Sequence, residues 1–278
     1  MTRIRVIPIS GSIGVEIHNV DLSIELSKST FSEIRKTFIE HGLIFFRGQN
    51  LTPKDHLRFA KLWGKININR FFAKVEGYEQ IAEVRKEPDQ DINIGGGWHT
   101  DHSYDQIPAM GSILFAKETP KEGGDTLFAN MYRAYETLSE GLKVTLTSMN
   151  ACHSSRHVFG QHSGYAEASS GRIGNPELAT QEAIHPVIIT HPESKRKALY
   201  VNPEFTVNFE GWTIEESKPL LDYLIKHATR AENTTRFQWE PGSMAFWDNR
   251  CTWHYALNDY PGQLRLMHRI TVEGSALS

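Results

Sequence analysis

The stretch Trp98-His99-Thr100-Asp101-His102-Ser103-Tyr104 organises the interpretation of the whole chain. In an extended segment, side chains two residues apart point to the same face, so His99 and Asp101 can reach one metal ion while Thr100 points away. Two imidazoles and one carboxylate that leave other positions open form the site of non-haem Fe(II) oxygenases. Because a His-x-Asp pair alone is common by chance, the prediction of a metal site needs a second imidazole elsewhere.

The segment Trp247-Asp248-Asn249-Arg250-Cys251-Thr252-Trp253-His254 offers that imidazole at His254. The three candidate ligands are far apart in the sequence, so the fold must assemble the site. We expect Asp248 and Asn249 to shape the turn before His254, since short polar side chains favour turns.

Two arginines stand four residues apart in the apolar, strand-like run that follows. On a strand, Arg265 and Arg269 share one face. Burying a guanidinium group is costly unless an anion meets it, and arginine binds carboxylates through two parallel hydrogen bonds. The spacing therefore predicts a pocket for anions.

The composition is that of a globular protein. The 278 residues are 39% hydrophobic and 23% charged, with a net charge of -3, so we expect one domain over residues 1–278 and no nucleic-acid partner. Two cysteines are too few for a disulfide framework, which is typical of a reducing compartment. The chain has no apolar run long enough for a signal peptide or a membrane span, so we expect a cytoplasmic protein with no membrane partner.

Short apolar runs separated by glycine and proline favour a sandwich, barrel or jelly roll. The runs predicted as strands are 43–46, 112–116, 126–129, 186–190, 198–201, 236–239, 243–247 and 264–272. Helices are expected over 27–41, 53–63, 132–146 and 213–228. Pro219 lies inside the last of these, so its regular part is predicted to start nearer Ser217. Residues 154–183 have no sustained period, and we interpret them as a lid over the site, with a mobile surface loop as the alternative.

Together these features resemble the taurine/alkylsulfonate and aryloxyalkanoate (TauD/TfdA) family of Fe(II)- and 2-oxoglutarate-dependent dioxygenases. The matching residues are Trp98-His99-Thr100-Asp101, Gly123-Gly124-Asp125-Thr126, Trp247-Asp248-Asn249-Arg250, His254, Arg265 and Arg269. The resemblance implies a mainly β double-stranded β-helix, or jelly roll, with flanking helices. It also implies an enzyme that uses Fe(II), 2-oxoglutarate and O2 to hydroxylate a small organic acid, with succinate and CO2 as coproducts.

The resemblance assigns a role to each matching residue. His99, Asp101 and His254 would be the iron ligands and the catalytic centre. Thr126 and Arg265 would bind the distal carboxylate of 2-oxoglutarate, and Arg269 would lie near the acidic end of the substrate. His102 would contact substrate or support the ligands, with a structural role as the alternative.

The chain departs from taurine-specific members where those carry polar groups for the substrate amine. Asn69 and Phe72 stand in place of a histidine and a tyrosine, and Ile94 and glycines replace acidic and amide residues. These residues would form part of the substrate site. The departures favour an apolar tail or an aromatic ring attached to an acidic group, as in alkylsulfonates, alkyl sulfates or aryloxyalkanoates.

Two other functions stay open at this point. Relatives of this architecture hydroxylate amino acids or natural-product intermediates, and a non-catalytic jelly roll could retain a structural metal. Structural zinc sites usually have four protein ligands, whereas the sequence offers three, which favours catalysis. On the resemblance, we also expect a homo-oligomer, either a dimer or a tetramer.

Overall fold

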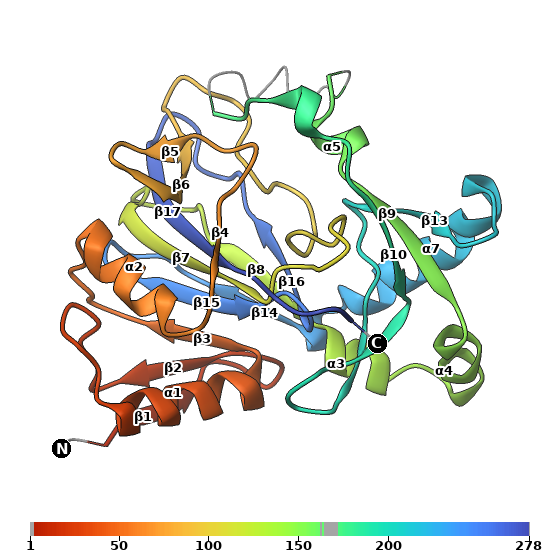
Figure 1. Cartoon of the computed structure of the whole chain (residues 1–278), viewed down its shortest axis with the longest axis horizontal. Helices are drawn as coiled ribbons and strands as arrows, with labels where there is room; N and C mark the ends of the chain where they lie inside the picture. The colour runs from red at the N-terminus through yellow and green to blue at the C-terminus, as the bar shows by residue number, and fades with distance from the viewer. Residues whose placement is uncertain (1–2, 162, 164–171, 278) are drawn as a thin grey trace.

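The computed structural model describes residues 3–161, 163 and 172–277, and four sheets dominate it (Figure 1). The strands are β1 (Arg5–Pro8), β2 (Val15–His18), β3 (Leu43–Phe46), β4 (Ile66–Asn67), β5 (Lys74–Val75), β6 (Tyr78–Lys86), β7 (Gly111–Glu118), β8 (Thr126–Asn130), β9 (Asn150–Ser154), β10 (Glu182–Pro186), β11 (Ile188–Thr190), β12 (Lys197–Leu199), β13 (Thr206–Phe209), β14 (Thr234–Phe237), β15 (Met244–Asp248), β16 (Thr252–Ala256) and β17 (Arg265–Val272). The helices are α1 (Lys28–His41), α2 (Pro53–Lys61), α3 (Met131–Glu136), α4 (Glu140–Thr147), α5 (Arg156–Phe159) and α7 (Ile214–Ala228), with short 3-10 turns at Pro176–Leu178 and Ala231–Asn233.

The largest sheet has nine strands in the order β1-β2-β3-β15-β7-β17-β6-β5, with β4 paired to β17. It faces a three-stranded sheet in the order β14-β8-β16. Apolar side chains from both sheets meet in one buried cluster that includes Leu114, Phe128, Phe237 and Trp247. This packing confirms the predicted mainly β jelly roll with flanking helices.

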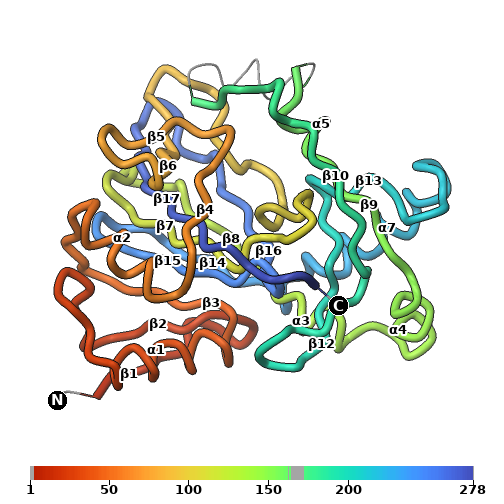
Figure 2. Tube along the Cα trace, viewed as in Figure 1, coloured from red at the N-terminus to blue at the C-terminus, as the bar shows by residue number. Residues whose placement is uncertain are grey.

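Strand β7 shows how the sequence separates the two faces of the large sheet. Leu114 and Ala116 belong to the cluster between the sheets, whereas Ile113 and Phe115 belong to a second cluster on the opposite face. Side chains alternate between faces along a strand, so one strand serves both clusters. Helices α1 and α2 contribute Ile34, Phe38 and Phe59 to the second cluster, and Figure 2 traces both helices alongside the large sheet. Leu114, on the other face, lines a cavity.

The predicted helices at the N-terminal end are confirmed, because their ends carry strong local signals. The Ser27 side chain accepts a hydrogen bond from the backbone of Thr30, and Gly42 ends α1 with φ 68°. Thr52 and Asp55 form a reciprocal capping box at α2. That helix ends at Lys61, two residues before the predicted end.

Two helix predictions need correction. The helix expected over 132–146 is two helices, α3 and α4, since Ser139 caps a new helix with its side chain. Helix α7 begins directly after Thr213 and not near Ser217, because Thr213 and Glu216 form a complete capping box. Pro219 lies inside α7 and costs it one backbone hydrogen bond, which the capping box and the packing of the helix offset.

A third layer lies beside the jelly roll, on the right in Figure 1. It contains the sheet β10-β9-β13 and the pair β11-β12, and α3 and α7 pack with them in a third buried cluster. The sequence did not predict β6, β9, β13 or β16. No helix among the described residues is long and apolar enough to cross a membrane.

The segment predicted as a structureless lid has defined structure where it is described. It includes α5, the turn at Pro176–Leu178 and the start of β10. Residues 162 and 164–171 lie outside the described residues. The prediction of a lid over 154–183 stays a prediction.

Candidate functional site

A cavity of about 340 Å³ lies between the two sheets of the jelly roll. Its walls are largely apolar, with Phe72, Leu114, Phe159, Phe205 and Trp247 among them. The polar residues that line it include every candidate metal and 2-oxoglutarate residue: His99, Asp101, His254, Thr126 and Arg265. The fold therefore brings together what the sequence placed far apart.

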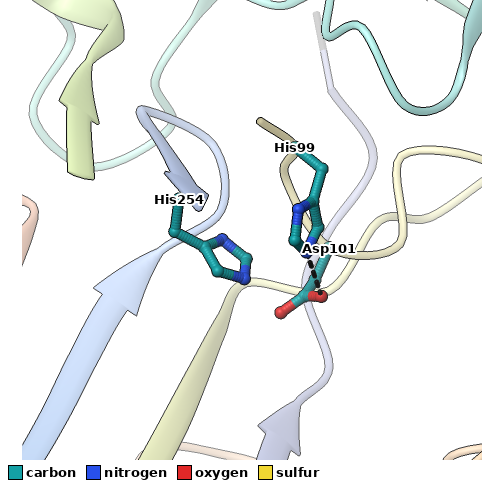
Figure 3. Close-up of side chains that lie close together, drawn as sticks. All are labelled: His99, Asp101 and His254. Atoms are coloured by element: carbon teal, nitrogen blue, oxygen red, sulfur yellow. Dashed lines mark ion pairs between the residues drawn. The ribbon is translucent and has the colours of Figure 1, made fainter. Parts of the chain in front are cut away.

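A two-residue antiparallel bridge joins the two candidate histidines. The backbone N–H of His99 donates to the carbonyl of His254 at 3.1 Å, and the N–H of His254 donates back at 2.8 Å. The ring centroids lie 4.0 Å apart. Figure 3 shows both rings directed toward Asp101. Backbone pairing thus holds the two residues side by side and sets the spacing between their imidazoles.

Asp101 is held by two further side chains. Ser112 of β7 donates to Oδ2 at 2.6 Å, and Arg269 of β17 donates to Oδ1 at 3.1 Å. Burial by itself would raise the pKa of Asp101, but the positive charge of Arg269 and the nearby imidazoles outweigh it and lower that pKa well below its usual range. Asp101 is therefore a carboxylate anion, the form that binds a metal.

Both histidines can turn a ring nitrogen toward a metal. The Nδ1 of His99 lies 2.8 Å from the carbonyl of Gly97, which can only accept, so Nδ1 is the donor there and Nε2 is the nitrogen left for a metal. Nε2 lies 3.8 Å from Oδ1 of Asp101. Burial is the largest cause that lowers the pKa of His254, and it favours the neutral form of this side chain.

The three side chains fit a single metal ion. One ligand atom from each of His99, Asp101 and His254 lies within 4.8 Å of the others, and all three residues are buried. The Nδ1 of His254 is buried and has no hydrogen-bond partner among the described residues. Two imidazoles and one carboxylate beside an open cavity are the donor set of non-haem Fe(II) sites.

A second polar group lies where β8 and β17 border the cavity. Arg265 is buried, and its Nε donates to the carbonyl of Gly124 at 3.1 Å. Its Nη2 has no hydrogen-bond partner among the described residues, and no described carboxylate lies within ion-pair distance. Burial lowers the pKa of Arg265, as expected for a cation without a counter-ion. Trp239 donates to the Thr126 hydroxyl at 2.9 Å and orients it.

Arg269 stands between the candidate metal ligands and the apolar wall. One of its N–H groups bonds Asp101, its guanidinium lies 4.4 Å from the centroid of the Phe72 ring, and its buried Nε has no partner among the described residues. Arg265 and Arg269 both line the cavity, so the prediction that they share one face is confirmed. The sequence did not predict the contact between Arg269 and Asp101.

The predicted substrate residues separate into two groups. Phe72, Ile94 and Arg269 line the cavity, but Asn69 and His102 do not. Asn69 instead accepts hydrogen bonds from the backbone N–H groups of Phe71 and Phe72 at 2.9 and 3.0 Å, so it shapes the loop that presents Phe72.

His102 points away from the cavity because its backbone turns back, with φ 62°. Its Nδ1 pairs with Asp105 at 3.0 Å. Asp248 shapes the turn before His254, as predicted: its carboxylate accepts three hydrogen bonds from Arg250, one from the backbone N–H and two from the side chain. Asn249 lies in the same turn, but its side chain donates to the carbonyl of Ala109 at 3.4 Å.

Several residues that define the site carried no signal in the sequence. Ser112, Trp239 and Glu204 all contact site residues or line the cavity. Each acts through a partner far away in the chain or through a backbone atom. Ser112 lies in a strand that was predicted correctly, yet alternation alone could not identify Asp101 as its partner.

Comparison with known proteins adds independent findings. Residues 5–271 match the family described as taurine catabolism dioxygenase TauD, TfdA family. The chain is 37% identical to an alkylsulfatase of Acinetobacter baylyi over 270 residues, which cover 96% of this chain and 84% of the relative. It is 34% identical to an alpha-ketoglutarate-dependent sulfate ester dioxygenase of Pseudomonas putida over 270 residues, covering 96% and 88% of the two chains.

A solved structure shares the fold. The crystal structure of a taurine dioxygenase from Burkholderia xenovorans superimposes with a TM-score of 0.84 at 33% identity, covering 99% of this chain and 93% of the other. The match extends over both sheets and the flanking helices. It therefore includes every element that borders the cavity.

Proposed function

Because the chain belongs to the TauD, TfdA dioxygenase family and is a 2-oxoglutarate-dependent dioxygenase that uses Fe(II) and O2, we propose that it hydroxylates an alkyl sulfate or a related organic acid with an apolar tail. The observation that carries this proposal is the pairing, in one cavity, of a His-Asp-His cluster with two arginines on a largely apolar wall. The cluster suits Fe(II), the arginines suit two acids, and the wall suits a hydrocarbon chain.

Each polar residue has a proposed role. His99, Asp101 and His254 hold Fe(II), which supplies the oxygen chemistry that turns 2-oxoglutarate and O2 into succinate and CO2 and hydroxylates a C–H bond. The Gly97 carbonyl keeps the proton of His99 on Nδ1 and so presents Nε2 to the metal. Ser112 keeps Asp101 in position, a task that outer partners commonly perform for metal ligands.

Two further roles concern the acids. Arg265 and Thr126 bind the distal carboxylate of 2-oxoglutarate, because the free N–H groups of Arg265 are buried without a counter-ion. Arg269 meets the acidic group of the substrate beside Phe72 and so fixes which carbon faces the metal.

The apolar wall supports a sulfate ester over taurine. Phe72 and Ile94 make their part of the cavity wall apolar, and the two relatives described above are named for alkyl sulfates or sulfate esters. Hydroxylation of the carbon that bears the ester oxygen gives a product that collapses to an aldehyde and a sulfate ion. The C–O bond to sulfate breaks, and the hydroxyl oxygen becomes the aldehyde oxygen.

A succinate-release screen tests the proposal. Purified enzyme with Fe(II), 2-oxoglutarate and O2 is given alkyl sulfates, alkylsulfonates, taurine, aryloxyalkanoates and amino acids. We expect succinate release to be fastest with alkyl sulfates and to be matched by aldehyde and sulfate. His99→Ala should remove this activity, whereas His41→Ala, a matched change outside the cavity, should keep it. Amino acids or taurine as the fastest substrates would contradict the proposal.

The proposal extends to the state of the protein. We expect one domain over residues 1–278, acting in the cytoplasm as a homodimer or homotetramer; the assembly rests on the family resemblance. Light scattering of the purified protein in solution measures the assembly directly, and a monomeric mass would contradict that part of the proposal.

A further inference from the structure

Glu204 places a carboxylate in the wall of the cavity. It lies in the loop between β12 and β13, is half-buried, and lines the same cavity as His99 and Arg269. Its backbone carbonyl accepts a hydrogen bond from His157 at 2.6 Å. Its carboxylate has no hydrogen bond or ion pair with any described residue, unlike Asp101, which has two partners.

The position of this carboxylate is well defined by its neighbours. A Cβ atom added to Gly97 would lie 2.8 Å from Oε2 of Glu204, so the carboxylate sits directly over the Gly97 backbone. Gly97 in turn accepts the hydrogen bond from His99. The next residue, Phe205, packs its ring against Tyr104 with centroids 4.8 Å apart. Glu204 thus adds a carboxylate to the part of the wall that contains Gly97 and Phe205.

Charge decides which part of a substrate can lie beside Glu204. Arg265 and Arg269 come from β17, whereas Glu204 comes from a separate loop. An acidic group is drawn to the arginines and repelled by the carboxylate, and such forces are stronger in a cavity than in bulk water. The acidic group of a substrate is therefore expected at the arginines, and a different part of the substrate beside Glu204. A carboxylate without a partner accepts hydrogen bonds and favours a donor.

We propose that Glu204 forms a second polar subsite, which binds a protonated amine or another hydrogen-bond donor on the tail of the acidic substrate. This inference rests on the proposed function, since it assumes that the acidic group lies at Arg269. It names the substrate class more narrowly: an organic acid, such as a sulfate ester, whose apolar chain carries a donor group. An ordinary solvated carboxylate at the rim of the cavity would show no such preference.

Matched ligands test the subsite by binding alone. Dissociation constants of hexyl sulfate, 6-aminohexyl sulfate and 6-hydroxyhexyl sulfate are measured by calorimetry, without oxygen, on enzyme loaded with Fe(II) and 2-oxoglutarate. The readout is the preference for each donor-bearing ligand over hexyl sulfate. In Glu204→Gln we expect the preference for the amine over hexyl sulfate to fall about tenfold or more. In Glu204→Leu we expect the preference for the alcohol over hexyl sulfate to fall by a similar factor. Both expectations rest on the strength of hydrogen bonds to a charged group.

Glu79→Gln, an exposed change in β6, should leave both preferences as in the parent protein. Circular dichroism and thermal melting check that each variant is folded. If neither preference falls in folded Glu204 variants, or if none of the three ligands binds the parent protein, the subsite is refuted. If the preferences fall in the Glu204 variants but the parent protein releases no succinate with any sulfate, the subsite is retained and the proposed function is refuted.

Discussion

Replacing Arg265 with methionine should separate stability from function. The arginine is buried, has an N–H group without a partner among the described residues, and has no described carboxylate within ion-pair distance. Methionine keeps much of its length but removes the charge. We therefore expect Arg265→Met to fold more stably without 2-oxoglutarate and to bind 2-oxoglutarate poorly.

The contacts of Arg265 set the size of both effects. Removing a buried donor without a partner gains about 1–3 kcal/mol, and losing the bond to the Gly124 carbonyl costs about 0.5–1.5 kcal/mol. The net gain is about 1 kcal/mol in the free energy of unfolding, or roughly 2–4 °C in Tm for a chain of this size. Losing one partner of a buried charge pair costs about 3–5 kcal/mol, so 2-oxoglutarate affinity should fall roughly 10²–10⁴-fold.

Two measurements test the expected stability and 2-oxoglutarate affinity of Arg265→Met. Thermal melting without 2-oxoglutarate gives Tm, and an anaerobic titration of the Fe(II) enzyme gives the affinity for 2-oxoglutarate. Arg58→Met, at a partly exposed arginine paired with Asp55 in α2, is the control and should leave that affinity unchanged. A 2-oxoglutarate affinity near that of the parent protein, or a Tm several degrees lower, would refute the account of Arg265.

Four further predictions follow from the contacts of the site and of the turn beside it. His99→Ala should abolish turnover and metal binding, and a chelator should do the same reversibly in the parent protein, with activity restored by Fe(II) but not by Zn²⁺. Ser112→Ala should weaken Fe(II) binding roughly tenfold to a hundredfold, because Asp101 loses a buried hydrogen bond; a metal titration measures this. Arg269→Leu should weaken both Fe(II) and acidic-substrate binding while 2-oxoglutarate affinity stays near normal, and an equal loss for all three ligands would contradict separate roles. Asp248→Asn should make the free energy of unfolding less dependent on pH in acid. Burial alone would raise the pKa of Asp248, but Arg250 outweighs it and lowers that pKa in the folded protein, so the carboxylate stabilises the fold fully above the unfolded carboxyl pKa of ~3.9 and loses this effect as the pH falls below it. Urea melts between about pH 5 and 2 measure the difference.

Features with local causes could be predicted from the sequence. Helix α1 follows from Ser27 and Gly42, whose capping contacts lie within a few residues of each other. The buried strand β3 follows from four consecutive apolar residues. The metal cluster was predicted because its residue types are themselves specific, even though the distances between His99 and His254 are set by the fold.

Features that depend on distant contacts could not be predicted. Strand β16 holds His254 within Thr252–Ala256, and its pairing with β8 makes it a strand although its residues do not alternate. His102 seemed a substrate residue because it follows Asp101, but its positive φ turns it toward Asp105. The sequence shows which residues are adjacent in the chain, but the backbone conformation determines where their side chains point.

The bridge between His99 and His254 also governs when the site can form during synthesis. His254 follows His99 by 155 residues (254 minus 99), so the second imidazole exists only after that whole stretch has been synthesised. A chain that ends before His254 carries His99 and Asp101 alone and lacks one of the three metal ligands. The metal site is therefore complete only when the long loop between the two histidines has been made and closed.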